Sequence, residues 1–79
     1  MFEVRAVRVP PGCERAYDEA EWQDALVVIE RGAIELEGSS GNCHHFGRGD
    51  VLSLAGLSLR ALRNPGREPA LLLAVARRR

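Results

Sequence analysis

Short apolar runs alternate with turn residues at nearly even intervals from residue 24 to residue 76. Runs this short and this regularly spaced are typical of antiparallel strands joined by tight turns. Such strands close into a sandwich or a small barrel, so the pattern predicts an all-β fold. The expected strands lie at Leu26–Ile29, Ile34–Leu36, Cys43–Phe46, Val51–Leu54, Leu57–Leu62 and Ala70–Ala76.

The first part of the chain is less regular. Apolar and polar residues alternate in Phe2–Ala6 and again in Val7–Val9. The change of phase between these segments predicts a strand with a β-bulge. Residues 14–24 are strongly acidic and only lightly apolar. They fit a short amphipathic helix in isolation, but the all-β pattern favours an edge strand and a loop.

Three of the expected strands differ in which faces they bury. Leu26–Ile29 is continuously apolar, which predicts that both of its faces are covered. Ile34 and Leu36 alternate with glutamates, which predicts one buried and one wet face, and the small residues of Gly38–Asn42 then form a hairpin turn. The last strand, from residue 71 to residue 75, is apolar on both faces, so it is either central or in contact with a partner.

The chain has 79 residues, which predicts one domain spanning residues 1–79 with a small core. Self-association is the simplest way to add buried surface when cysteines are few. Cys13 and Cys43 do not have the spacing of a disulfide framework or a zinc site, so we expect free, buried or half-buried thiols. No run resembles a signal peptide or a membrane span, so the expected location is cytoplasmic.

Charge is balanced overall but not along the chain. All eleven cationic residues are arginines, so lysine chemistry such as Schiff-base formation is excluded. Residues 1–40 carry nine acidic residues against four arginines, and residues 41–79 carry two against seven. Strands from the two halves interleave in a closed barrel, so this split need not produce charged patches. Arg77–Arg79 is too short to indicate nucleic-acid binding, and we expect neither nucleic acid nor membrane as a partner.

Three segments together resemble a minimal cupin domain, over about residues 10–76. They are the strand–glycine–strand segment 27–36, the turn into a strand at 49–52, and the segment 64–75 that joins an asparagine and a glycine to an apolar last strand. The resemblance implies a small antiparallel jelly-roll barrel.

Many cupins bind a divalent metal through three histidines and a glutamate. Matching the family's glycines and asparagine puts these four positions at Asp18, Ala20, Ala25 and Arg60. Alanine has no donor atom, and a guanidinium does not bind cations. One carboxylate does not make a transition-metal site, so the resemblance implies no metal in the usual place, and no other cofactor is expected.

His44 and His45 are adjacent in an expected strand, so they point to opposite faces. If Phe46 packs inward, His44 shares its face, and His45 points outward with Cys43. An outer Cys43–His45 pair supplies at most two metal ligands, so a solvated or packed histidine pair is the better interpretation.

Asp18 and Arg60 occupy positions that approach one ion in the metal-binding relatives, so the resemblance places them near each other at the barrel mouth. One interpretation is an internal ion pair that replaces the metal. The other is that Arg60 binds a carboxylate or phosphate of a ligand. Tyr17 and Trp22 flank this region and either wall a small pocket or serve as core or interface residues. The predicted ligand-binding residues are Asp18, Arg60, Tyr17 and His44.

Three functions follow from this reading. The first is a metal-independent cupin that binds a small, anionic molecule in the barrel, with Arg60 as its anchor. The second is a metal-independent isomerase or cyclase that uses Asp18. The third is a structural dimerisation module with a filled barrel. We also expect a homodimer through the N-terminal strand and the apolar strand at residues 71–76.

Overall fold

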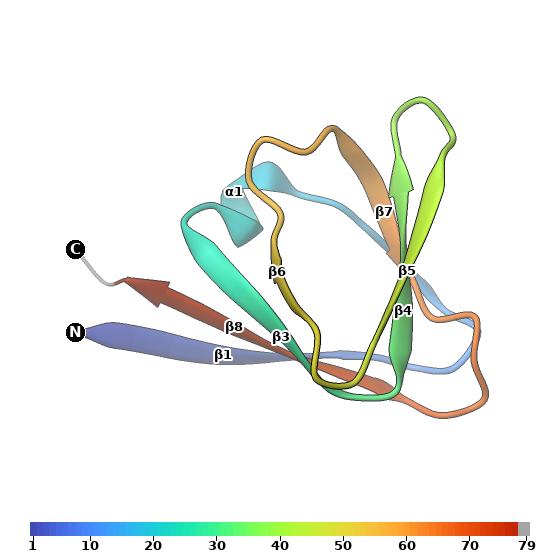
Figure 1. The fold of residues 1–79 in the computed structure, drawn as a ribbon, viewed down its shortest axis with the longest axis horizontal. Helices are drawn as coiled ribbons and strands as arrows, with labels where there is room; N and C mark the ends of the chain where they lie inside the picture. The colour runs from blue at the N-terminus through green and yellow to red at the C-terminus, as the bar shows by residue number, and fades with distance from the viewer. Residues whose placement is uncertain (78–79) are drawn as a thin grey trace.

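The computed structural model describes residues 1–77. Two four-stranded antiparallel sheets form the fold (Figure 1), so the predicted all-β jelly roll is confirmed. Sheet A has the strand order β1-β8-β3-β6, and sheet B has the order β2-β7-β4-β5. The elements are β1 (Phe2–Val9), β2 (Glu14–Ala16), α1 (Glu19–Trp22), β3 (Ala25–Arg31), β4 (Ala33–Gly38), β5 (Cys43–Gly47), β6 (Val51–Ser53), β7 (Leu59–Arg63) and β8 (Ala70–Arg77).

The core lies between the two sheets. Because side chains alternate along a strand, every second residue of each central strand points into it. The largest fully buried side chains come from both sheets, from the short helix and from the first residues after β6 and β7. They are Trp22, Ile29, Ile34, Leu54, Leu62, Leu72, Val9, Val27 and Asn64.

β1 is one regular strand, and the predicted β-bulge is wrong. Every residue from Phe2 to Val9 pairs with β8 without a change of register. Val7 and Val9 point into the core, whereas Phe2 and Val4, which have the opposite phase, are exposed. The apolar pattern changes phase because the first half of the strand places apolar residues on its outer face.

The acidic segment forms both an edge strand and a helix. β2 lies at the edge of sheet B, as predicted, but α1 replaces the predicted loop. Asp18 begins the helix, because its side chain accepts a hydrogen bond from Ala20 N at 3.1 Å. Four residues do not form a stable helix alone. The complete burial of Trp22 in the core fixes α1 in place.

The prediction that both faces of β3 are covered is wrong. Val27 and Ile29 are buried, but the Leu26 side chain is 52% exposed on the other face. β8 lies between β1 and β3, so of the two alternatives considered for this strand the central position is confirmed. Its inner residues are buried, and its outer residues are only half-buried.

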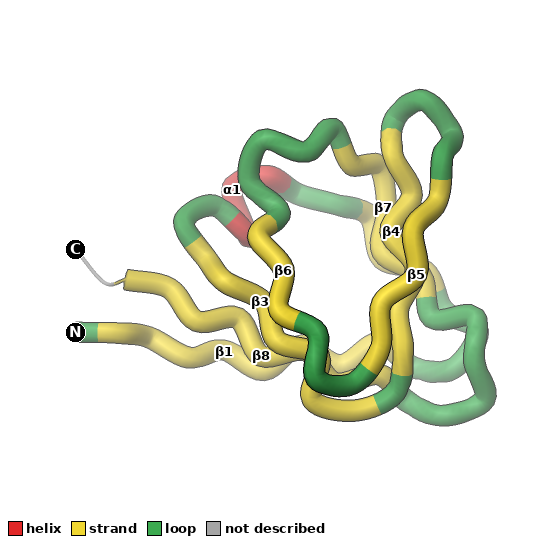
Figure 2. The backbone as a smooth tube through the Cα atoms, viewed as in Figure 1, coloured by secondary structure: helices red, strands yellow, loops and turns green. Residues whose placement is uncertain are grey.

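Two residues fix the turns at one end of the barrel. Gly32 joins β3 to β4 at a φ of 71°, and a Cβ there would lie 2.7 Å from the backbone oxygen of Pro69. Only glycine fits such a position without strain. The buried Asn64 donates from Nδ2 to Val9 O at 3.0 Å and to Glu68 O at 2.7 Å, and accepts from Gly66 N. Asn64 therefore links the end of β7 in sheet B to β1 in sheet A. Figure 2 shows the backbone of the strands of both sheets and of the short helix α1.

Within residues 1–77, no helix is both long enough and apolar enough to cross a membrane.

Candidate functional site

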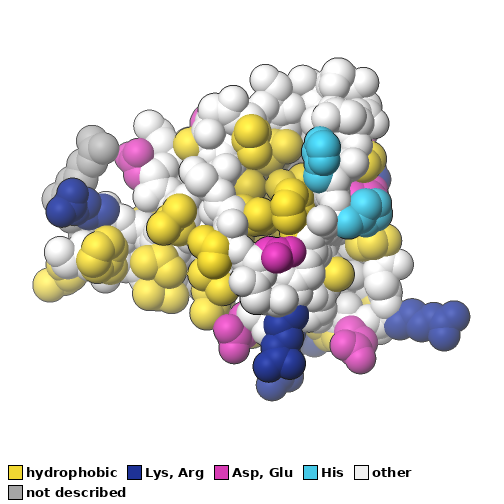
Figure 3. Space-filling view, in the orientation of Figure 1, with side chains coloured by type: hydrophobic (Ala, Val, Ile, Leu, Met, Phe, Trp, Pro, Cys, Tyr) yellow, Lys and Arg dark blue, Asp and Glu magenta, His cyan; other side chains and the backbone are white. Residues whose placement is uncertain are grey.

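A pocket of about 270 Å³ lies between the β4–β5 hairpin and the loop before β7. Figure 3 shows hydrophobic side chains at the opening between β5 and β6, with the histidines beside them. The pocket is lined by Leu36, Gly38, Ser39, Ser40, Asn42, His44, Phe46, Leu57, Ser58 and Leu59.

Strand alternation places the apolar floor of the pocket. In the β4–β5 pairing, Leu36 is opposite His44 and Ile34 is opposite Phe46. Because Ile34 and Leu36 are buried in the core, His44 and Phe46 also point inward. The expectation that His44 shares the inner face with Phe46 is confirmed.

A polar wall is formed by the hairpin turn. The Ser40 hydroxyl donates to Asn42 Oδ1 at 2.7 Å, and Asn42 Nδ2 lies 3.1 Å from His44 Nε2. An amide nitrogen only donates, so His44 Nε2 accepts and the neutral ring carries its proton on Nδ1. Nδ1 has no protein partner within residues 1–77, so it can donate a hydrogen bond to a ligand.

The turn itself is held on both sides. Gly38 N donates to Asn42 O at 2.7 Å, and Ser39 N donates to Ser58 O at 2.8 Å. Gly41 lies in this hairpin turn with a φ of 91°, a left-handed backbone conformation that glycine adopts without strain. The polar wall is therefore tied to the loop on the opposite side of the pocket.

Arg60 lies outside the pocket. β7 changes register against β4 here: Ala61 is opposite Glu37, but Leu59 is opposite Gly38. This bulge turns Leu59 into the pocket and leaves Arg60 on the outer face. The Arg60 side chain is 71% exposed, and its Nη1 lies 3.6 Å from Glu37 Oε2.

The predicted ion pair between Asp18 and Arg60 is wrong. The Asp18 carboxylate caps α1, and the Arg60 guanidinium faces Glu37. The resemblance placed Arg60 at the barrel mouth, whereas the bulge on β7 turns its side chain to the outer face. The binding roles predicted for Asp18 and Arg60 stay predictions.

Tyr17 connects the two sheets rather than lining the pocket. Its hydroxyl lies 2.7 Å from Glu19 Oε2, to which it donates, and 3.4 Å from the backbone oxygen of Leu54, which follows β6. Burial, the hydrogen bond to Glu19 and the nearby carboxylates raise the pKa of Tyr17 to about 12. Tyr17 is therefore a neutral hydrogen-bond donor at physiological pH.

Trp22 serves as a core residue, one of the two alternatives considered for it. Its side chain is fully buried, and its Nε1 has no hydrogen-bond partner in the described chain. The guanidinium of Arg5 lies 5.2 Å from the centre of its ring. Arg5 and Arg15 also form ion pairs with the Glu21 carboxylate. Burial raises the pKa of Glu21, but these arginines outweigh it, so the net effect is a lowered pKa.

The outer face of sheet B carries a charged network centred on Arg63. Arg63 lies 2.8 Å from Glu35, 2.5 Å from Glu37 and 2.7 Å from Glu14. These three hydrogen bonds raise the pKa of Arg63 further above its usual value. His45 Nε2 lies 3.2 Å from Glu35 Oε2, so the prediction that His45 points outward is confirmed.

Both cysteines are free and exposed, so the expectation of buried thiols is wrong. Cys43 is opposite Glu37 on the outer face of sheet B. Local desolvation and then the Glu35 and Glu37 carboxylates raise the pKa of the Cys43 thiol, which disfavours the nucleophilic thiolate. Within residues 1–77, no group of three or more His, Cys, Asp or Glu side chains is arranged to hold a metal ion.

Several pocket residues were missed by sequence reasoning. Leu59 was hidden by the bulge on β7, which no local pattern announces. Ser40 and Asn42 were assigned only to a turn. A signal was present, because a polar turn that leads directly to an inward-facing histidine must place its side chains at the mouth of the barrel.

No protein-family model matches the sequence, and no curated protein sequence is significantly similar to it. Solved structures are similar in fold. The Cupin 2 domain of an XRE family transcriptional regulator from Enterobacter cloacae superposes with a TM-score of 0.75 at 20% identity, over 99% of this chain and 83% of that one.

Two further structures have higher identity. A Cupin 2 conserved barrel domain protein from Salinispora arenicola is 28% identical with a TM-score of 0.71, over 94% of this chain and 60% of that one. A sugar phosphate isomerase from a cupin superfamily, from Silicibacter pomeroyi, is 27% identical with a TM-score of 0.66, over 98% of this chain and 51% of that one. The two facing sheets and the superposition on these structures show that the chain has the fold of a small cupin domain.

Proposed function

We propose that this cupin binds a small molecule in the pocket between the β4–β5 hairpin and the loop before β7, with His44 as the principal polar contact. The combination that supports it is an apolar floor beside one directed polar group. Leu36, Phe46 and Leu59 supply the floor, and the Ser40–Asn42–His44 chain supplies a fixed donor. Ligand sites commonly combine apolar lining with a few oriented polar groups.

The lining favours a neutral, polar ligand over the anionic one expected at first. No arginine lines this pocket among the described residues, and Arg60 is paired with Glu37 on the outer face. The volume of about 270 Å³ lies just below the range of about 300–1,000 Å³ that drug-sized ligands occupy. The ligand is therefore small, and hydroxyl or carbonyl groups would suit His44, Ser58 and Asn42.

An isomerase is the second candidate, because one structural relative is named a sugar phosphate isomerase at 27% identity, although this chain spans only 51% of it. Proton transfer in this pocket would fall to His44, the titratable side chain in its lining. Asp18, the base considered first, caps α1 instead.

The test is an NMR screen of ¹⁵N-labelled protein against a library of small neutral polyols, amides and sugars. Binders should shift the amide signals of His44, Phe46 and Leu59. His44→Ala should weaken their binding by about 2- to 10-fold, the equivalent of one lost hydrogen bond.

His45→Ala is the matched control, because His45 neighbours His44 but points to the outer face. It should leave binding unchanged. Ligands that shift signals elsewhere, or equal losses in both folded variants, would contradict the proposal. A library with no binder would favour the filled-barrel alternative. Hits converted to a new product would move the assignment to the isomerase.

A further inference from the structure

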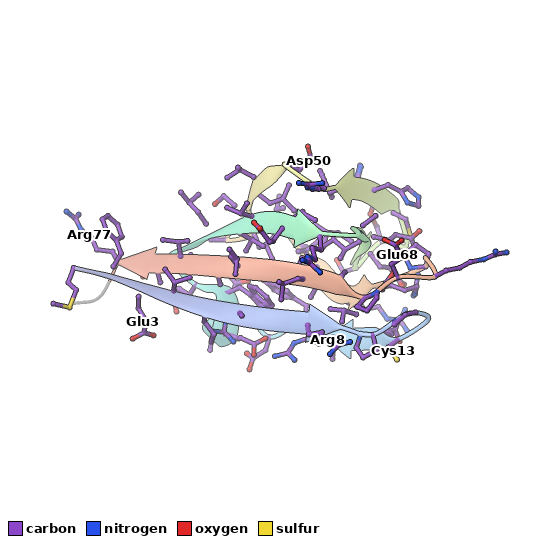
Figure 4. All side chains as sticks on the ribbon, turned by 90° about the horizontal axis from the view of Figure 1, so that it is seen from below. Glu3, Arg8, Cys13, Asp50, Glu68 and Arg77 are labelled. Atoms are coloured by element: carbon purple, nitrogen blue, oxygen red, sulfur yellow. The ribbon has the colours of Figure 1, made fainter. Side chains whose placement is uncertain are left out.

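A second concavity lies away from the pocket at His44, where the β3–β4 and β5–β6 turns meet the loop before β8. It is an open groove of about 1000 Å³, and its charged lining residues are Arg8, Arg31, Arg48, Glu30 and Glu68. We call it the arginine groove. Figure 3 shows arginine side chains projecting from this end of the molecule, and Figure 4 shows Arg8 and Glu68 in the half of the molecule remote from Glu3 and Arg77.

Two of the arginines reach the groove from the strands on either side of β8. Arg8 of β1 and Arg31 of β3 are both opposite Leu71 of β8. Residues directly opposite each other share a face, so all three side chains lie on the outer face of sheet A. Neighbouring strands are about 4.8 Å apart, so the backbones of the two arginines are separated by about 10 Å. Both guanidiniums can therefore reach one anion above Leu71.

A bulge in β3 directs Arg31 to this face. Ile29 is opposite Leu72 and Arg31 is opposite Leu71, so Glu30 is an extra residue without a partner in β8. In a regular strand Arg31 would share the inward face of the buried Ile29. The extra residue turns Arg31 outward, which is how bulges redirect side chains next to functional sites.

The third arginine is presented by a turn with a fixed backbone. Arg48 lies between β5 and β6, where Gly47 N donates to Asp50 Oδ2 at 2.8 Å. Gly49 N donates to Ile29 O at 2.9 Å, and Ile29 N donates to Asp50 O at 3.0 Å. The turn is therefore fastened to the end of β3, and the Asp50 carboxylate binds the backbone of the turn.

Within residues 1–77, none of the three arginines forms an ion pair. This differs from Arg5 and Arg15, which both pair with Glu21. The two glutamates of the groove, Glu30 and Glu68, also form no ion pair in the described part of the chain. Three guanidiniums against two carboxylates leave one positive charge in the lining, which an anionic ligand would neutralise.

We propose that the arginine groove binds the phosphate group of a small hydroxylated molecule, at a site separate from the pocket at His44. Guanidiniums donate paired hydrogen bonds that match phosphate oxygens, and one phosphate has oxygens for more than one arginine. Leu71 and Pro69 give the carbon atoms of the ligand an apolar surface. The carboxylates of Glu30 and Glu68 accept hydrogen bonds from hydroxyl groups and oppose further negative charge, so the groove suits a single phosphate monoester.

The proposal is tested by titrating the ¹⁵N-labelled full chain with glycerol phosphate, inorganic phosphate or glycerol, followed by NMR at constant ionic strength. Both phosphates should shift the amide signals of Arg31, Gly32 and Leu71 until these saturate, and glycerol should not. Glycerol phosphate should bind more tightly, because its hydroxyls reach the glutamates. Equal affinity for inorganic phosphate would overturn the role of the glutamates and assign the site to free phosphate.

Arg8→Gln and Arg31→Gln should each weaken the binding of glycerol phosphate by about 3- to 10-fold, the equivalent of one lost hydrogen bond to a charged group. Both arginines are exposed, so the fold should survive, which circular dichroism checks. Arg67→Gln is the matched control. Arg67 is exposed and close to the groove in sequence but does not line it, so the same loss of charge should leave binding unchanged. Glu30→Gln removes a repelling charge and should strengthen the binding of inorganic phosphate by about 2-fold.

Three results would overturn the proposal. One is a set of signals that NaCl at the same ionic strength shifts as far as phosphate does. Another is an equal loss of affinity in folded Arg31→Gln and Arg67→Gln. The third is a set of phosphate-induced shifts centred on His44, which would place the anion in the barrel pocket instead.

Discussion

The outer face of sheet B is covered by ion pairs, whereas the outer face of sheet A carries aliphatic side chains. The inner faces of both sheets pack against the same core. On sheet B, Arg63 forms ion pairs with three glutamates of the same chain, so the charges at the centre of that face are paired within the chain. On sheet A nothing in the described chain covers Leu26 or Val4. The difference shows that charge pairing within the chain completes one outer face, whereas the other leaves large apolar side chains exposed.

The strongest test compares the two sides of one strand. Leu72 of β8 is fully buried in the core, and Leu73 is half-buried on the outer face of sheet A. Leu72→Ala should lower the free energy of unfolding by about 2–5 kcal/mol at any protein concentration, because it leaves a cavity. Leu73→Ala should cost clearly less, because a half-buried side chain on the outer face leaves no enclosed cavity. Urea unfolding measures both.

Equal losses for Leu72→Ala and Leu73→Ala would contradict the distinction between the core face and the outer face of β8. A smaller loss for Leu72→Ala than for Leu73→Ala would contradict the position of the core itself.

The charged network on the outer face of sheet B can be disrupted by replacing its central residue, Arg63. Arg63→Met keeps most of the side-chain bulk but leaves Glu14, Glu35 and Glu37 close together without their shared cation. The melting temperature should fall by several degrees at low salt. It should fall less at 1 M NaCl, where the Debye length is only about 3 Å.

Arg60→Met is the control for this prediction. Arg60 is 71% exposed and makes one 3.6 Å contact with Glu37, so its loss should change the melting temperature little. A loss for Arg63→Met that is independent of salt would show that its packing, and not its charge, supports the face.

A smaller effect is expected at Tyr17, where the two sheets meet. Tyr17 is the single tyrosine of the chain, so ultraviolet absorbance reports its ionisation alone. Its pKa is raised from 10.0 to about 12, chiefly by burial and by the hydrogen bond to Glu19. The folded state therefore favours the neutral phenol. This stabilisation is complete below pH 10 and is lost as the pH rises toward about 12.

Glu19→Gln should lower the pKa of Tyr17 without restoring the ordinary value, because burial remains. An ionisation midpoint near pH 10 in the folded natural protein would contradict the burial of Tyr17 and its hydrogen bond to Glu19.

The sequence alone determined the strands and most of their relative faces. Alternation in β4 correctly predicted that Ile34 and Leu36 face the core while the glutamates between them face outward. Alternation in β5 correctly predicted that His44 and Phe46 lie on the same, inner face. The glycine-rich and asparagine-rich turns placed the hairpins. These features depend on neighbouring residues and on the fixed two-residue period of a strand, so local pattern suffices to find them.

Tertiary structure decided the rest. The bulge on β7 turned Arg60 outward and Leu59 into the pocket, and burial of Trp22 made a helix of a segment expected to be a loop. The side of β1 that meets the core depends on its register with β8, some 70 residues away in the chain. Such choices are set by pairing between distant segments, and a shift of one residue reverses every side chain, so no local pattern can fix them.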